Sequence, residues 1–145
     1  MLHKVILVMV LGFLLVNCSS EVENINGPAD SISHDDIVGI WSLSEINYSQ
    51  GDSLVIRYPE ADAISITFKF WKDNTGQLLQ FQKGVTDIHD FQWNVRSNSI
   101  VLTWDLGEVE YIKCHLIEET LCLEYSYETS TGVIVLATYI FMQEN

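Results

Sequence analysis

Side chains of the types that perform catalysis are few in this chain and lie far apart. One short cluster places a histidine beside carboxylates, at Asp87, His89 and Asp90. Such a group can act as a general base when burial and geometry shift its pKa, but this segment is more typical of a solvated entry into a strand. The sequence has no G-x-S-x-G, H-E-x-x-H, P-loop or dinucleotide-binding motif. We therefore predict no catalytic residue and no enzyme activity.

Two of the cysteines could form a disulfide or remain free thiols. Cys114 and Cys122 flank a predicted turn, and a bridge requires Cα atoms about 4.4–6.8 Å apart on the same face of the hairpin. The alternation of the neighbouring leucines slightly favours Cys114 facing the core and Cys122 facing away, so both outcomes stay open. No histidine lies at a metal-ligand spacing from either cysteine, and we predict no metal site and no cofactor.

The remaining cysteine ends an N-terminal segment with the features of an export signal. Lys4 precedes an uncharged run, residues 5–16, which is short for a membrane span and typical of a secretory signal. The run ends in Leu15-Val16-Asn17-Cys18, which resembles the lipobox of bacterial lipoproteins. That resemblance implies cleavage before Cys18 and lipidation of its thiol. Each buried acyl CH₂ contributes about 0.8 kcal/mol, so two or three chains anchor a protein durably to a membrane.

We divide the chain into three parts. They are a lipoprotein signal peptide, residues 1–17; the lipidated Cys18 with a flexible tether, residues 18–35; and a β-domain, residues 36–145. The tether is polar and contains the breaker pair Gly27-Pro28. Towards its end, Ser33 is expected to cap a single helical turn. Ser19 after the lipidated cysteine, in place of aspartate, favours the outer membrane under the enterobacterial sorting rule, with the periplasmic or surface face left open.

Length and charge narrow the classes of function. The chain has 145 residues, 48% hydrophobic and 19% charged, which suits one packed domain and excludes a disordered polymer. Lys plus Arg number 7 against 20 Asp plus Glu, for a net charge of −13. Removal of the predicted signal peptide would leave a net charge of −14, because Lys4 is the one charged residue of that segment. Nucleic acid is excluded as a partner, since binding it needs a basic face.

From Ile40 to Met142 the hydrophobic pattern alternates with a period of two, which indicates β-strands. About eight strands are predicted, at residues 39–48, 63–71, 77–83, 89–96, 99–105, 109–117, 120–127 and 133–142. The links are short, so sequential strands should pair antiparallel. Closure into an up-and-down β-barrel would remove the exposed edges. The predicted fold is an all-β antiparallel barrel, and a two-sheet β-sandwich is the alternative.

The predicted inward face is rich in large aromatic side chains. We expect the barrel interior to be lined by Trp41, Phe68, Phe70, Phe81, Phe91, Trp93, Trp104, Tyr125 and Tyr127. Such a lining could bind a small apolar ligand, or it could form a plain packed core. An eight-stranded barrel is just wide enough for either arrangement, and the short strands favour a filled or nearly filled interior.

The start of the first strand, Gly39-Ile40-Trp41, resembles the G-x-W motif that opens the first strand of lipocalins. Residues 36–142 as a whole resemble the small lipocalin-like domain of Bacteroidetes lipoproteins. The resemblance rests on the lipobox, the polar tether, Ile37-Val38-Gly39-Ile40-Trp41, the turn Asp73-Asn74-Thr75-Gly76 and the final Tyr139-Ile140-Phe141. It implies a barrel that binds a small ligand. No arginine follows Arg96, so the arginine that stacks across the lipocalin tryptophan has no counterpart unless Lys113 takes its place.

The sequence therefore predicts a lipid-anchored binding protein of the bacterial cell envelope. Its expected partners are the membrane, through the lipid, and a small apolar ligand. An alternative is a protein-interaction or inhibitor lipoprotein whose acidic exterior attracts a cationic protein. Trp71 falls on the outward parity beside a turn and is a candidate contact in that alternative.

Overall fold

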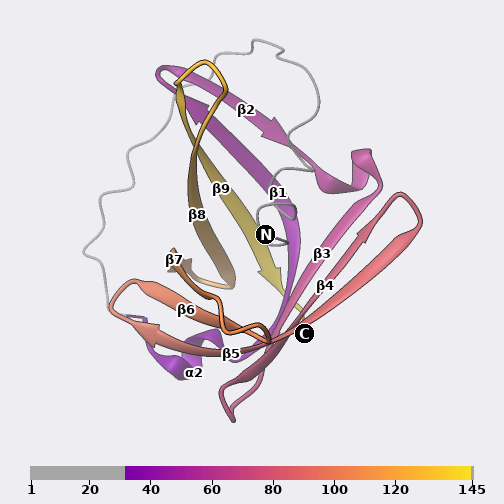
Figure 1. The fold of residues 1–145 in the computed structure, drawn as a ribbon, viewed down its shortest axis with the longest axis vertical. Helices are drawn as coiled ribbons and strands as arrows, with labels where there is room; N and C mark the ends of the chain where they lie inside the picture. The colour runs from indigo at the N-terminus through magenta and orange to yellow at the C-terminus, as the bar shows by residue number, and fades with distance from the viewer. Residues whose placement is uncertain (1–31, 145) are drawn as a thin grey trace.

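The computed structural model describes residues 32–144, which form a closed antiparallel β-barrel of eight strands with one additional strand (Figure 1). The strands are β1 Gly39–Gln50, β2 Ser53–Arg57, β3 Ile64–Phe70, β4 Thr75–Gln82, β5 Val85–Arg96, β6 Ser99–Trp104, β7 Val109–Ile117, β8 Thr120–Glu128 and β9 Ile134–Gln143. They pair in the order β2-β1-β3-β4-β5-β6-β7-β8-β9, and β9 pairs back onto β1. This closure confirms the predicted barrel over the sandwich.

The additional strand is β2, which the sequence analysis did not predict. It reverses from β1 through a turn at Gly51, where φ is +57° and glycine avoids steric cost. β2 pairs with the second half of β1, from Ile46 to Gln50, while β3 pairs with the first half, from Gly39 to Ser42. The two strands therefore share one edge of β1, and a 3₁₀ turn, η2 Pro59–Asp62, connects them.

Cross-strand register decides which side chains face the interior, because directly paired residues lie on the same face of a sheet. In β4, Gly76 pairs with Phe70 and with Phe91, which are both buried. Gly76 and Leu78 therefore face inward, and Phe81 faces outward with 40% of its surface exposed. The prediction that Phe81 lines the interior was wrong. The register has a steric cause, since a Cβ on Gly76 would lie 2.1 Å from the Phe91 ring.

A short helix, α2 His34–Ile37, packs against the end of the barrel where β1 begins (Figure 1). The predicted helical turn is confirmed, and the Asp36 carboxylate accepts hydrogen bonds from the Ser33 hydroxyl and backbone N–H, at 2.7 and 2.9 Å. These bonds lower the pKa of Asp36. Ile37 is fully buried, and its carbonyl accepts a 2.8 Å hydrogen bond from the Trp41 indole.

The folded domain includes residues before the boundary that was predicted at residue 36. Ile32 packs against the hydrophobic core and His34 stacks on a core tryptophan, so residues 32–35 belong to the folded domain. The predicted signal peptide, Cys18 and residues 19–31 lie outside the described residues. No helix within residues 32–144 is long and apolar enough to cross a bilayer.

Candidate functional site

The barrel interior is the candidate binding site, and aromatic rings fill its middle. Phe68, Phe70, Phe91 and Phe141 contact one another with ring centroids 5.4–5.9 Å apart. All four are at most 5% exposed. Edge-to-face and offset contacts at these distances are typical of a close-packed aromatic core. This part of the interior is therefore filled, as the short strands predicted.

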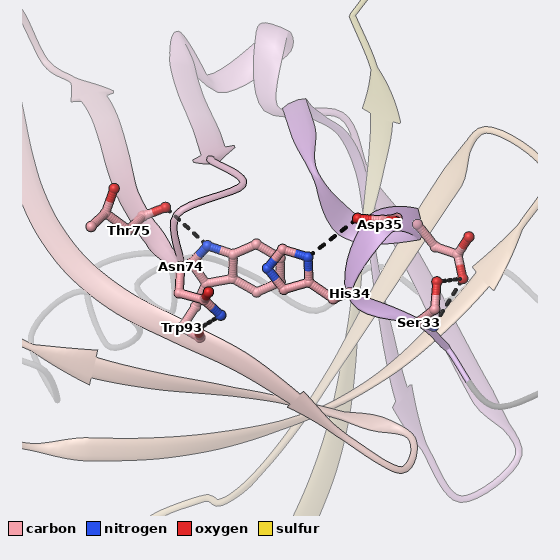
Figure 2. A network of polar contacts seen from close by, with 7 residues as sticks. Ser33, His34, Asp35, Asn74, Thr75 and Trp93 are labelled. Atoms are coloured by element: carbon pink, nitrogen blue, oxygen red, sulfur yellow. Dashed lines mark hydrogen bonds and ion pairs between the residues drawn. The ribbon is translucent and has the colours of Figure 1, made fainter.

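The end of the barrel beside α2 is closed by a stack of two rings (Figure 2). The imidazole of His34 lies 4.4 Å from the ring of Trp93 with an angle of 8° between the planes. The Trp93 indole donates a 2.9 Å hydrogen bond to the carbonyl of Thr75, and the Asn74 amide donates to the Trp93 carbonyl at 3.1 Å. Together these contacts join α2, the β3–β4 turn and β5 into a plug that covers the core.

The opposite end differs, and we call it the mouth. It comprises the inward-facing residues at the end of the barrel farthest from α2, namely Tyr48, Arg57, His89, Trp104, Glu110, Tyr125 and Tyr127. These residues face inward because they either pair across strands with a core residue or lie an even number of positions from one that does on the same strand. The core partners include Ile46, Leu78, Leu102 and Ala137. All except Trp104 are only partly buried, so water reaches the inner face here. Figure 1 shows the β1–β2 and β8–β9 turns at the top and α2 at the lower left.

Tyrosine hydroxyls line one side of the mouth. Burial raises the pKa of Tyr48 and of Tyr125, and the charge of Glu110 adds to the effect on Tyr125. These phenols are neutral near pH 7, as an ordinary tyrosine is, and each carries one O–H donor. The Tyr48 hydroxyl is buried and lies beside the hydroxyl of Tyr139, with which it interacts.

A tryptophan and a carboxylate line the other side. The Trp104 indole donates a 3.2 Å hydrogen bond to Oε2 of Glu110. The His89 and Trp104 rings are nearly perpendicular, with centroids 6.3 Å apart. The sequence analysis did not select Glu110. Glu110 lies on the same parity of β7 as Ile112 and Cys114, which are both buried. That shared parity was the signal that could have identified Glu110 as inward-facing.

The structure places eight of the nine predicted interior residues on the inner face, with Phe81 as the exception. Trp41, Phe68, Phe70, Phe91 and Trp93 belong to the packed middle and the plugged end. Trp104, Tyr125 and Tyr127 belong to the mouth, where contact with a ligand stays a prediction. Trp71 is 43% exposed, on the surface as expected.

The groups that could perform covalent chemistry do not assemble. His89 and Asp90 both lie within β5, which begins earlier than predicted. The His89 side chain faces inward. The Asp90 side chain faces outward and accepts a 3.0 Å hydrogen bond from Gln77. Cys114 is buried, Cys122 lies on the outer parity, and both are free thiols. Burial raises the pKa of Cys114 to about 11, and it also raises the pKa of Cys122. Neither thiol is therefore an activated nucleophile at neutral pH.

Comparisons with known proteins agree with this fold. No known family description matches the sequence, and no curated protein matches it. Among solved structures, the chain is similar to a lipocalin-like protein from Bacteroides uniformis, with TM-score 0.50 and 16% identity over 75% of this chain and 99% of that one. An uncharacterized protein from Bacteroides eggerthii matches with TM-score 0.49 and 15% identity, over 74% and 98% of the two chains. The fold is lipocalin-like.

Proposed function

We propose that this protein is a non-enzymatic binding protein that holds a small apolar ligand at the mouth of its barrel. The observation that carries the proposal is the contrast along the interior. Aromatic residues fill and plug one end, while Tyr48, Tyr125 and Tyr127 face inward at the other end and are only partly buried. Inward-facing aromatic rings with a few placed hydroxyls are the usual lining of a small-molecule site.

We further propose that the barrel is held at the outer membrane by lipid on Cys18. The support for this step is the sequence of residues 1–18, with its short hydrophobic run and its likeness to a lipobox. Incorporation of radiolabelled palmitate by the expressing bacterium tests it, because Cys18→Ala should abolish labelling. Labelling that persists in this variant would contradict the lipid anchor.

Binding at the mouth can be tested with the neutral fluorescent probe N-phenyl-naphthylamine, which brightens in apolar surroundings. We expect saturable enhancement with the purified full-length protein. Tyr125→Ala should weaken binding about two- to twelvefold, because an aromatic contact contributes about 0.5–1.5 kcal/mol. Tyr111→Ala is the matched control, since Tyr111 is 64% exposed on the outer face. Absence of saturable binding, or equal weakening by both variants, would contradict the proposal.

A second function is favoured by an apolar patch on the outside. Leu79 pairs with Ile88 across β4 and β5, and Phe81 lies two residues farther along the same outer face. Phe81 and Ile88 are 40% and 56% exposed on a protein of net charge −13. These features suit a cationic protein partner that also presents an apolar surface. Binding of a basic probe protein such as lysozyme should weaken in ~0.5 M salt, because charges are then screened within a few ångströms; undiminished binding would count against this role.

A further inference from the structure

Among residues 32–144, the outer edge of β2 is left unpaired by the other strands. β2 is the last strand in the pairing order, and β1 is its one partner there (Figure 1). β3 takes the other half of the same β1 edge and does not pair with β2. An unpaired edge presents a row of backbone N–H and C=O groups that can pair with another strand.

The turn before β2 decides which backbone groups point to this open edge. Gln50 and Ser53 flank a two-residue turn and pair with each other, so they form a hydrogen-bonded pair. Hydrogen-bonded and non-hydrogen-bonded pairs alternate along an antiparallel ladder. The N–H and C=O groups of Leu54 and Ile56 therefore point away from β1, to the open edge.

β2 lacks several features that usually prevent pairing at an edge. Natural edge strands are commonly protected by lysine, proline or a β-bulge. The sequence of β2 is Ser-Leu-Val-Ile-Arg, and its register with β1 runs without a shift from Ser53 to Arg57. Its three central residues are aliphatic, and Ile56 is 42% exposed. This edge is therefore suited to receive a further strand.

The sequence of β2 is also compatible with pairing to itself. Consider two β2 strands that run antiparallel about a twofold axis at Val55. Leu54 then lies opposite Ile56 of the partner subunit, and Ile56 lies opposite the partner's Leu54. Each of these pairs exchanges two backbone hydrogen bonds, because both residues carry the open backbone groups. Each also places two aliphatic side chains together on the outer face.

Charge favours this edge as a contact between two copies. The chain has a net charge of −13, so two copies repel each other where their carboxylates meet. β2 contains no acidic residue. The twofold register places Arg57 opposite Ser53 of the partner subunit, and Arg57 retains its 3.8 Å ion pair with Asp62 of its own chain. No like charges therefore face each other within the paired strands.

We propose that two copies of this protein associate through their β2 strands, which pair antiparallel about a twofold axis at Val55. Such a contact is isologous and is complete with two copies, so it forms a dimer and no filament. Because β2 has only five residues, the interface is small and the dimer is expected to dissociate at micromolar concentrations. The contact lies beside the mouth, since Val55 pairs with Tyr48.

Engineered cysteines test the register in the full-length protein. A non-hydrogen-bonded antiparallel pair has Cα atoms about 4.5 Å apart, which is within the range for a disulfide. Val55→Cys should therefore form a disulfide-linked dimer under mild oxidation, seen by non-reducing electrophoresis. Ile56→Cys is the matched control on the same strand, because Ile56 lies opposite Leu54 and not opposite itself. The wild type, with its native cysteines, gives the background.

A proline at the open edge tests the hydrogen bonds. Ile56→Pro removes an N–H that points to the partner subunit and none that pairs with β1, so it should leave the barrel folded. Sedimentation equilibrium of the full-length wild type should show a monomer–dimer equilibrium. Ile56→Pro should weaken dimerisation about tenfold or more, because each copy loses one hydrogen bond. Thermal melting verifies that the variant is folded.

Three results would overturn the proposal. The first is a wild type that stays monomeric at every concentration measured. The second is cross-linking of Ile56→Cys as efficient as that of Val55→Cys, which would indicate random collision. The third is dimerisation of a folded Ile56→Pro variant as strong as that of the wild type.

Discussion

The two ends of this barrel use aromatic residues in opposite ways. At the α2 end, the indole nitrogens of Trp41 and Trp93 are satisfied by backbone carbonyls, and His34 covers the outermost ring. At the mouth, the Trp104 indole is satisfied by a carboxylate, and tyrosine hydroxyls face the interior. The first arrangement fixes both indoles to the backbone. The second keeps polar groups on an inner surface that water can reach, and this difference locates the candidate site within an otherwise continuous core.

The largest effect on stability should come from removing an aromatic ring from the packed middle of the barrel. Phe91→Ala removes a ring that is 3% exposed and should destabilise the protein by about 3–5 kcal/mol. Phe81→Ala removes the same side chain from the neighbouring strand, but from the outer face, and should cost well under half as much. Urea unfolding followed by circular dichroism measures both. Equal losses of stability would mean that the inner and outer faces of β4 are assigned incorrectly.

The fit between Gly76 and Phe91 gives the next largest effect. Gly76→Ala places a methyl group against the Phe91 ring and 2.7 Å from the Lys69 carbonyl, and overpacking of this kind costs about 1–3 kcal/mol. Combining it with Phe91→Leu should cost less than the sum of the two single changes, because the smaller side chain makes room. Strict additivity of the free energies of unfolding would show that the two residues do not compete for space.

The buried thiol of Cys114 predicts a dependence of stability on alkaline pH. In the unfolded chain the thiol ionises near its ordinary pKa of 9.0, whereas burial raises the pKa to about 11 in the folded protein. Between these values the folded state binds more protons, so stability should fall as pH rises. Burial of Tyr125 and Tyr139 adds to the fall at higher pH. Cys114→Ala should lose less stability than the wild type between about pH 9 and pH 11 in urea titrations; identical losses would refute this origin.

The smallest effect concerns the plug. His34→Ala removes the stack on Trp93 and should cost about 1 kcal/mol, with faster hydrogen exchange in residues 34–41. His89→Ala, which removes only a distant edge contact to Trp104 at the mouth, should leave that exchange unchanged. The comparison fails if both variants accelerate exchange at the α2 end.

Alternation along the chain was sufficient to predict the barrel and most of its lining, because period-two patterns in β3, β5 and β8 coincide with the buried faces. It failed in β4, where leucines at 78 and 79 suit either parity and the Phe91 ring over Gly76 selects one. It also missed β2, a five-residue strand in which no residue is fully buried.

The mouth was harder to predict, since it depends on contacts between distant segments. Tyr125 and Tyr127 were found by their parity, but the approach of Trp104 to Glu110 follows from the turn between β6 and β7, which the pattern does not specify. The stack of His34 on Trp93 likewise joins residues that no local signal relates.

Hydroxyl-radical footprinting, with and without N-phenyl-naphthylamine, tests the central claim most directly because it reports water contact at each aromatic side chain. The account predicts that Tyr125 and Tyr127 are oxidised in the free protein and protected by the probe, while Trp41 and Trp93 stay unmodified in both samples. Oxidation of Trp41 and Trp93 at rates similar to Tyr125, or no protection of the two tyrosines at saturating probe, would contradict it.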